Sequence, residues 1–225
     1  MIKDNVASVL MRIDEASKKS KYDEKVKLVA VSKYRSLDEL EQLYDSGLRE
    51  FGENRVQELL DKYPHFEGRV KWHLIGTLQK NKVKYIIDKV VLIHSVDSVA
   101  LAKEINSHAI KHSLVMPILL QVNYAKEESK HGFNEDDVED ALIEISKLSN
   151  VRVDGIMAMA PNVDDEEFLS SFFIKIRNNF DNLMQKFNKY DTIKISVLSM
   201  GMSGDFEIAL QNGSNMVRVG SALFE

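Results

Sequence analysis

The chain has 225 residues, of which 44% are hydrophobic and 29% are charged, so it can build a sizeable core and is not expected to be disordered. Its 35 acidic and 30 basic residues give a formal net charge of −5, which offers no chain-wide attraction for nucleic acid or for an anionic membrane. The sequence has no cysteine and no apolar run of the roughly 18 residues that a membrane helix needs, which excludes disulfides and thiolate metal sites and favours a cytoplasmic location.

The first predicted element is an amphipathic helix over residues 5–19. Val6, Val9, Leu10 and Ile13 are spaced so that they share one face of this helix. The helix precedes the first strand of the chain.

That strand is predicted over residues 27–32, "KLVAVS". Residues 28–31 are all apolar, whereas a half-exposed strand would alternate apolar and polar residues, so the strand is expected to be buried on both faces. Lys33 follows directly, at the point where such a strand reaches the surface.

Seven more strand-like runs follow, and segments with helical spacing separate them. The eight predicted strands are 27–32, 49–53, 70–76, 90–96, 116–123, 151–160, 194–201 and 216–220. Helical spacing is clearest over residues 37–44, 138–148 and 172–187.

Eight strands that alternate with helices are the inventory of a (β/α)8 barrel. No linker or break in composition divides the chain, so we predict a single barrel domain over residues 1–225. The last strand is followed only by "SALFE", and the helix over residues 5–19 would fill the gap left by a missing last helix. An open, doubly wound sheet is the competing architecture.

In a barrel of this kind, chemistry belongs to the carboxyl ends of the strands. Lys33 is the primary amine at such an end, and the apolar run before it predicts that its stem lies partly buried inside the barrel mouth. Taken alone, a lysine at the rim is more often a solvated charge. Partial burial would disfavour its ammonium form, and a neutral amine can form a Schiff base with an aldehyde.

The loops after the seventh and eighth strands have the composition of a phosphate site. They read "LSMGMSGD" and "VRVGSALF", and barrels often hold phosphate in these two loops. Ser203, Gly204, Gly220 and Ser221 are the candidates, although two glycine turns without a ligand would look the same. An amine for an aldehyde and a cradle for a phosphate are together what pyridoxal 5′-phosphate (PLP) requires.

Seven segments, in order, carry a resemblance to a known family. They are 28–33 "LVAVSK", 51–58 "FGENRVQE", 72–82 "WHLIGTLQKNK", 94–98 "HSVDS", 155–161 "GIMAMAP", 198–205 "LSMGMSGD" and 217–224 "VRVGSALF". The chain resembles the YggS/PROSC family of pyridoxal-phosphate-binding proteins, also called PLP homeostasis proteins. The resemblance covers nearly the whole sequence and implies an α/β fold, a (β/α)8 TIM barrel of the alanine racemase N-terminal (fold type III) kind with an extra N-terminal helix.

The resemblance also implies a set of cofactor-binding residues and no metal. They are Lys33, Asn54, Ser203, Arg218, Gly220 and Ser221. Lys33 would hold PLP as an internal aldimine, and Arg218 would face the pyridine nitrogen. A permanently cationic partner keeps that nitrogen unprotonated and makes the ring a poor electron sink.

Two functions remain open at this point. The first is a non-catalytic PLP carrier that serves PLP homeostasis or delivers PLP to apo-enzymes, and the second is a PLP-dependent amino-acid racemase. Two-base racemisation needs a second proton donor. Tyr34 is expected to point away from Lys33, which leaves Tyr124 as the candidate donor. A structural role is favoured for Tyr124. We therefore prefer the carrier, as a monomer without nucleic-acid or membrane partners.

Two histidine pairs in the sequence carry no predicted chemical role. His108 and His112 are four residues apart on a predicted helix, but the acidic residue of a HExxH motif is missing between them. His73 and His94 lie at strand ends, where they could line the cavity or simply be hydrogen-bonded below a loop.

Overall fold

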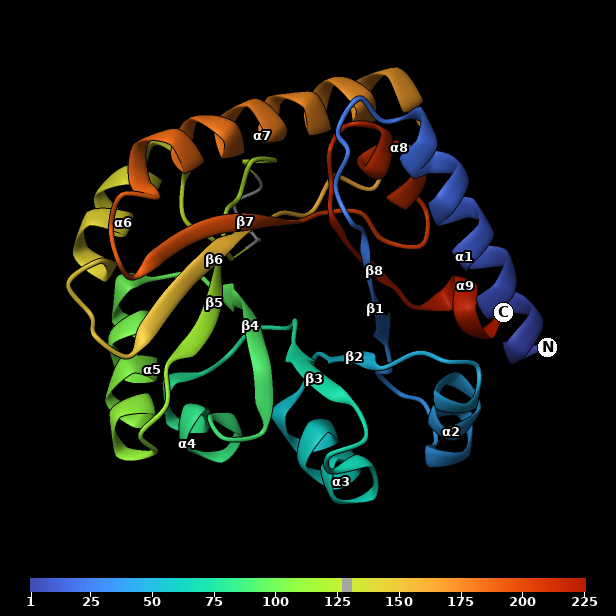
Figure 1. Cartoon of the computed structure of the whole chain (residues 1–225), viewed down its shortest axis with the longest axis horizontal. Helices are drawn as coiled ribbons and strands as arrows, with labels where there is room; N and C mark the ends of the chain where they lie inside the picture. Colours follow the sequence, from blue (N-terminus) through green and yellow to red (C-terminus); the bar gives the residue numbers. More distant parts are fainter. Residues whose placement is uncertain (127–130) are drawn as a thin grey trace.

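The computed structural model describes residues 1–126 and 131–225, and in these the strands form a closed, all-parallel barrel in the order β1 to β8 (Figure 1). The strands are β1 (Lys27–Val31), β2 (Glu50–Glu53), β3 (Lys71–Leu74), β4 (Val90–Val96), β5 (Met116–Gln121), β6 (Val151–Met157), β7 (Ile193–Ser199) and β8 (Met216–Val219). Pairing of β1 with β8 closes the barrel, which confirms the predicted (β/α)8 fold. The open sheet that was the alternative is wrong.

The helices lie on the outside of the ring of strands (Figure 1). The α-helices are α1 (Ile2–Lys19), α2 (Leu37–Asp45), α3 (Val56–Phe66), α4 (Val83–Ile86), α5 (Val99–Lys111), α6 (Val138–Ile145), α7 (Glu166–Phe187), α8 (Phe206–Gln211) and α9 (Ser221–Phe224). Two short 3₁₀ turns, η1 (Lys80–Lys82) and η2 (Glu135–Asp137), precede α4 and α6. Among the described residues, no helix has both the length and the apolarity that crossing a membrane would require.

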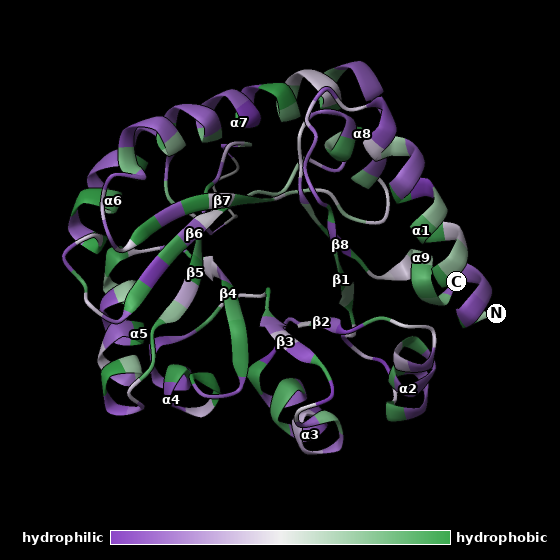
Figure 2. Cartoon of the chain, in the orientation of Figure 1, coloured by the Kyte–Doolittle hydropathy of each residue, from purple (hydrophilic) through white to green (hydrophobic). Residues whose placement is uncertain are grey.

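Helix α1 packs against α8 and α9 and so occupies the place predicted for it (Figure 1). Hydrophilic and hydrophobic residues alternate along α1 and α7, as expected for helices with one buried side (Figure 2). The buried residues of α1 are Val6, Val9, Ile13 and Ala16. Leu10, which was predicted to share this face, is 42% exposed, because the apolar stripe continues through Ala16 and leaves Leu10 at its edge.

Local sequence signals set several helix boundaries. The side chain of Ser36 accepts a hydrogen bond from the backbone N–H of Glu39 at the start of α2, and the Glu39 carboxylate accepts one from the Ser36 N–H. Ser98 caps α5 in the same way by accepting from the N–H of Leu101. Past the end of α2, Gly47 has φ +95°, a conformation that glycine adopts without strain.

Most of the core lies between the strands and the helices, and a smaller apolar cluster fills part of the barrel interior. The buried members of that inner cluster are Val29, Leu92, Leu119, Met157 and Met216. Strands β6 and β7 approach each other so closely at Gly155 that a Cβ there would lie 1.8 Å from the carbonyl oxygen of Val197. The rest of the interior is polar and supports the site described next.

Candidate functional site

A cavity of about 550 Å³ opens at the carboxyl ends of the strands. This volume lies within the range of small-molecule sites, roughly 300–1,000 Å³. It brings together Lys33, Asn54 and Arg218, three of the six predicted cofactor residues, from the ends of β1, β2 and β8. The other lining residues are Val31, Tyr34, Arg55, Ile75, Gly76, Thr77, Gln121, Met159 and Met202.

Lys33 lies at the rim of this cavity and is solvent-exposed. Lys33 as a whole is more exposed than predicted, because β1 ends at Val31 and the chain is already leaving the barrel when it reaches Lys33, although Lys33 still lines the cavity. Within residues 1–126 and 131–225, its ammonium group has no ion-pair or hydrogen-bond partner. The amine is therefore free to react at the cavity mouth.

A buried ion pair holds the backbone on one side of Lys33. Lys62 of α3 donates from Nζ to the carbonyl oxygen of Ser32 and to Oε1 of Glu53, both at 2.7 Å. The hydroxyl of Ser32 donates to the same Glu53 oxygen at 2.7 Å. Burial raises the pKa of Glu53, and the bonds from Lys62 and Ser32 oppose that effect. Because Glu53 is fully buried, this anchor excludes water and fixes the end of β1.

A second contact holds the other side of Lys33. The backbone N–H of Tyr34 donates to Oε2 of Glu58 at 2.9 Å, and Glu58 lies 3.7 Å from the ammonium of Lys62. Tyr34 adopts φ +60°, a left-handed conformation that turns the chain sharply after Lys33. The residues on both sides of Lys33 are thus anchored to α3 while its side chain stays free.

Arg218 of β8 is buried and aligned by three hydrogen bonds. Its Nη1 donates to the carbonyl oxygen of Ser199 at 2.9 Å and to the Ser199 hydroxyl at 2.6 Å, and its Nη2 donates to the carbonyl oxygen of Ala158 at 3.0 Å. Burial lowers the pKa of Arg218 to about 10, against the opposing charge of Asp205. At neutral pH the guanidinium is therefore a cation in the wall of the cavity.

His73 and His94 lie inside the barrel below Arg218 and do not line the cavity. His94 Nδ1 lies 3.2 Å from the Ser199 hydroxyl, and its Nε2 lies 2.9 Å from Nδ1 of His73. Nε2 of His73 lies 2.7 Å from Oε2 of Glu50. Burial lowers the pKa of His73, which its bond to Glu50 opposes, and burial together with the charges of nearby cations lowers the pKa of His94 further.

The loops after β7 and β8 meet beside the cavity, as predicted for a phosphate site. The Ser203 hydroxyl accepts from the backbone N–H groups of Gly220, at 3.1 Å, and of Ala222, at 3.5 Å. A Cβ on Gly220 would lie 3.4 Å from Cβ of Val31, which lines the cavity. Ser203, Gly220 and Ser221 themselves stand next to the lining residues rather than among them, so their role in binding stays a prediction.

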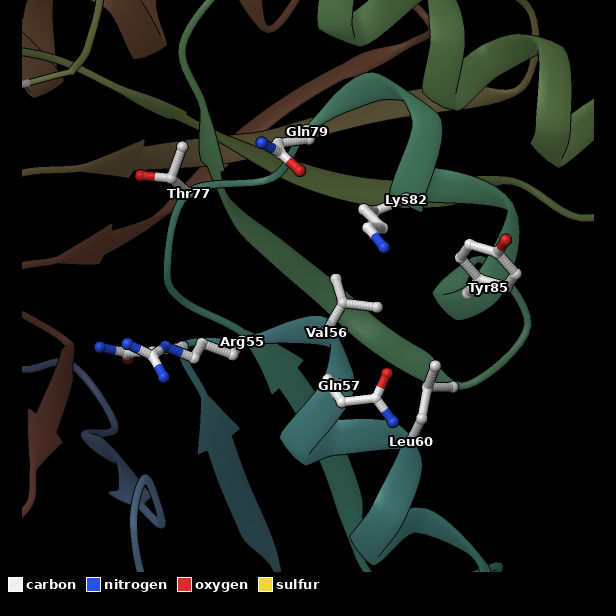
Figure 3. A pocket seen from close by; sticks show the side chains of 9 residues that line it. Arg55, Val56, Gln57, Leu60, Thr77, Gln79, Lys82 and Tyr85 are labelled. Atoms are coloured by element: carbon white, nitrogen blue, oxygen red, sulfur yellow. The ribbon is translucent and has the colours of Figure 1, made fainter.

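A second hollow of about 470 Å³ adjoins the first, and Asn54, Arg55 and Thr77 line both. In Figure 3, Gln57, Lys82 and Tyr85 border this hollow, while the side chain of Arg55 extends away from Lys82. The guanidinium of Arg55 lies over the ring of Tyr34, 5.4 Å from its centroid. Sequence reasoning gave Arg55 no role, although it directly follows Asn54 in the "FGENRVQE" segment.

The two tyrosines near strand ends differ in how well they agree with the sequence predictions. Tyr34 was expected to point away from Lys33, but it lines the same cavity because its left-handed backbone turns it back over the mouth. Tyr124 is buried, and its hydroxyl donates to Oδ1 of Asn179 at 2.7 Å. Burial raises the pKa of Tyr124, and it does not line the cavity, which agrees with the structural role favoured for it.

The described residues contain no cluster of three or more histidine and carboxylate side chains suited to a metal ion. His108 lies beside Glu104 on the surface of α5, with 3.1 Å between Nε2 and Oε1.

Comparisons with known proteins point to one family. Residues 6–225 match the family model of the alanine racemase N-terminal domain. A protein of Aquifex aeolicus named pyridoxal phosphate homeostasis protein is 39% identical to this chain over 223 residues, which cover 98% of this chain and 96% of the relative.

Solved structures agree in fold. The structure of PipY from Synechococcus elongatus with PLP bound matches with a TM-score of 0.86 at 31% identity, and the match covers 100% of both chains. An alanine racemase of Clostridium difficile matches with a TM-score of 0.73 at 18% identity, over 98% of this chain and 55% of the racemase, a likeness in fold alone.

Proposed function

The chain belongs to the pyridoxal phosphate homeostasis protein family, and from that premise we propose that it holds PLP at the barrel mouth and serves PLP homeostasis in the cytoplasm without turning over a substrate. One observation carries the proposal. A single cavity joins a free primary amine, Lys33, to a buried cation, Arg218, and lies beside the two loops of the predicted phosphate site. The PLP bound to the related PipY supports the choice of ligand.

The residues present fit this cofactor. PLP supplies an aldehyde, and Lys33 supplies the unpaired amine that can hold it as an aldimine. Ser203, Gly220 and Ser221 would take the phosphate, since the Ser203 hydroxyl has a proton to donate while it accepts from the Gly220 N–H. Asn54 would lie beside the ring, because it lines the cavity between the ends of β1 and β3.

Arg218 and the exposure of Lys33 both disfavour carbanion chemistry at this site. A cation that faces the pyridine nitrogen keeps that nitrogen unprotonated, so the ring withdraws electrons weakly from a bound amino acid. The exposed rim at Lys33 admits water, whereas carbanion chemistry generally needs water excluded. Exposure also suits exchange of PLP with an acceptor, and we propose apo-enzymes that depend on PLP as those acceptors, with the protein acting as a monomer.

The racemase alternative has one observation in its favour, which is Tyr34 at the cavity. The residue is 71% exposed, so its hydroxyl is not held in place as a second proton donor needs to be. Incubation of the PLP-loaded protein with L-alanine in deuterated water tests this point. We expect no more α-carbon exchange than with free PLP, and robust exchange that disappears in Tyr34→Phe would favour the racemase.

A titration with PLP tests the carrier function directly. We expect one equivalent to bind with the visible absorption of an aldimine, and then to transfer to an apo-enzyme when the two proteins are mixed. Lys33→Ala is expected to lose the aldimine absorption and to keep weak, reversible PLP binding through the phosphate loops. A protein that takes up no PLP, or that never releases it to an apo-enzyme, would contradict the proposal.

A further inference from the structure

A chain of polar side chains runs through the barrel interior from one end to the other. It begins at Glu50, the first residue of β2, passes through His73 and His94, and reaches the Ser199 hydroxyl, which contacts Arg218. Its contacts measure 2.7, 2.9, 3.2 and 2.6 Å in that order. Every link therefore lies at or close to hydrogen-bonding distance, and the chain ends at the cofactor cavity.

The chemistry of the two ends fixes the direction of every bond between them. Arg218 can only donate, so the Ser199 oxygen accepts from it, and the single Ser199 proton can be donated to Nδ1 of His94. His94 then carries its proton on Nε2 and donates to Nδ1 of His73. His73 in turn carries its proton on Nε2 and donates to Glu50, which as a carboxylate can only accept.

The reverse direction fails at Glu50. If His94 donated to Ser199 from Nδ1, the Nε2 atom of His73 would carry no proton and would face the carboxylate lone pairs. Burial alone would raise the pKa of Glu50, but the hydrogen bond from His73 and the positive charges around it, those of Lys27 and Lys71 included, lower it, so Glu50 is a carboxylate with no proton to donate. Burial lowers the pKa of both histidines below 6.5, so both imidazoles are neutral at pH 7, and the contact with Glu50 then places the proton of each on Nε2.

The polar chain compensates for the cost of burying the charge of Arg218. A buried guanidinium is costly without a compensating group, and within the described residues none of its hydrogen bonds goes to a carboxylate. The aligned dipoles of Ser199, His94 and His73 present their negative ends toward Arg218, and Glu50 holds them in that direction. The other charges near the chain are Lys27 and Lys71 beside Glu50, and Asp205 near Arg218.

The same bonds decide which donors of Arg218 remain for a ligand. A guanidinium has five N–H donors, and three of them bind Ser199 and Ala158. The N–H at Nε and the second N–H at Nη2 have no partner among residues 1–126 and 131–225. Because Arg218 lines the cavity, these are the donors that a ring nitrogen can reach.

We propose that Glu50, His73, His94 and Ser199 are positioning residues, a polarised chain that orients Arg218 and leaves two of its N–H groups for the cofactor. The effect of these residues on ligand binding rests on the proposed PLP function. The assignment of protons along the chain does not depend on PLP. Glu50 acts from the far end of the barrel, so its substitution changes no group that touches the cofactor.

The proton assignment is tested on the protein without PLP, by ¹⁵N nuclear magnetic resonance of the histidine side chains. We expect His73 and His94 as neutral Nε2–H tautomers that do not take up a proton between pH 7.5 and 6. An Nδ1–H tautomer at either residue, or protonation of either in that range, would overturn the assignment. This experiment is independent of whether PLP binds.

The positioning role is tested with Glu50→Gln, which keeps an acceptor for His73 and removes only the charge. Glu139→Gln makes the same charge change on the exposed face of α6, in a pair with Lys186, and serves as the control. We expect Glu50→Gln to weaken PLP binding roughly fivefold, the effect of about one hydrogen bond, and to make the spectrum of bound PLP more sensitive to pH, with Glu139→Gln unchanged. Binding and spectrum equal to those of the control in Glu50→Gln would refute the positioning role.

Discussion

Replacement of Lys62 by methionine tests whether the buried ion pair beside Lys33 supports the site. Methionine keeps most of the stem volume of the lysine and removes its charge. Glu53, which is fully buried, then loses its cation, and the carbonyl oxygen of Ser32 loses a donor at 2.7 Å. Breaking a buried pair from one side costs about 3–5 kcal/mol, much more than an exposed pair contributes.

The assay is thermal unfolding of the protein without PLP. For a chain of this size, about 1 kcal/mol corresponds to roughly 2–4 °C in Tm, so Lys62→Met should lower Tm by about 10 °C. Lys186→Met removes an equally short bond at 2.6 Å to Glu139, but both side chains are about half exposed, so its effect should be near zero. The double variant Glu53→Gln with Lys62→Met should recover part of the loss, because it leaves no buried unpaired charge.

Lys62→Met should also affect the chemistry of Lys33. The anchor holds Ser32, so its loss should slow formation of the aldimine at Lys33 even at temperatures where the variant is folded. A Tm for Lys62→Met within about 2 °C of that for Lys186→Met, with an unchanged rate of aldimine formation, would refute the reasoning.

Three further predictions concern the barrel and its interior. Gly155→Ala should prevent or strongly destabilise folding, because the added Cβ would lie 1.8 Å from the Val197 carbonyl oxygen; urea unfolding of the variant checks this, and wild-type stability would contradict it. Folding lowers the pKa values of His73 and His94 from 6.5, so the unfolded state binds more protons, and the free energy of unfolding should fall as the pH drops from 7 to 5. This fall should be shallower in a His73→Asn, His94→Asn double variant. Equal slopes in the two proteins would count against buried neutral histidines. Arg218→Glu should allow protonation of the ring nitrogen of bound PLP, seen as a spectrum that changes with pH, and an unchanged spectrum would show that Arg218 does not contact the ring.

The fold could be predicted because each strand carries its own signal in consecutive residues. The prediction of Lys33 needed only the rule that chemistry gathers at the carboxyl ends of parallel strands, whereas that of Asn54 came from the family resemblance. Arg218 was predicted through the family resemblance, and the structure places it in the same cavity. Local sequence was sufficient wherever the relevant neighbours are close along the chain.

The supports of the site could not be predicted in this way. His94 and Ser199 are 105 residues apart, and their contact exists only because the barrel closes. Nothing in the sequence indicated a role for Lys62, and only the packing of α3 on β2 shows that it is buried against Glu53. Lys33 is also more exposed than predicted. The strand before it ends one residue earlier than the sequence indicated, and that difference places Lys33 on the rim of the barrel mouth rather than inside it.

The most direct test of the account is to identify the atom that holds PLP. The loaded protein is reduced with borohydride, digested, and its peptides are mapped by mass spectrometry. We expect one pyridoxyl group per chain, on Lys33, and none in Lys33→Ala. Stoichiometric label on another lysine, such as Lys82 in the adjoining hollow, with Lys33 unmodified, would contradict the account.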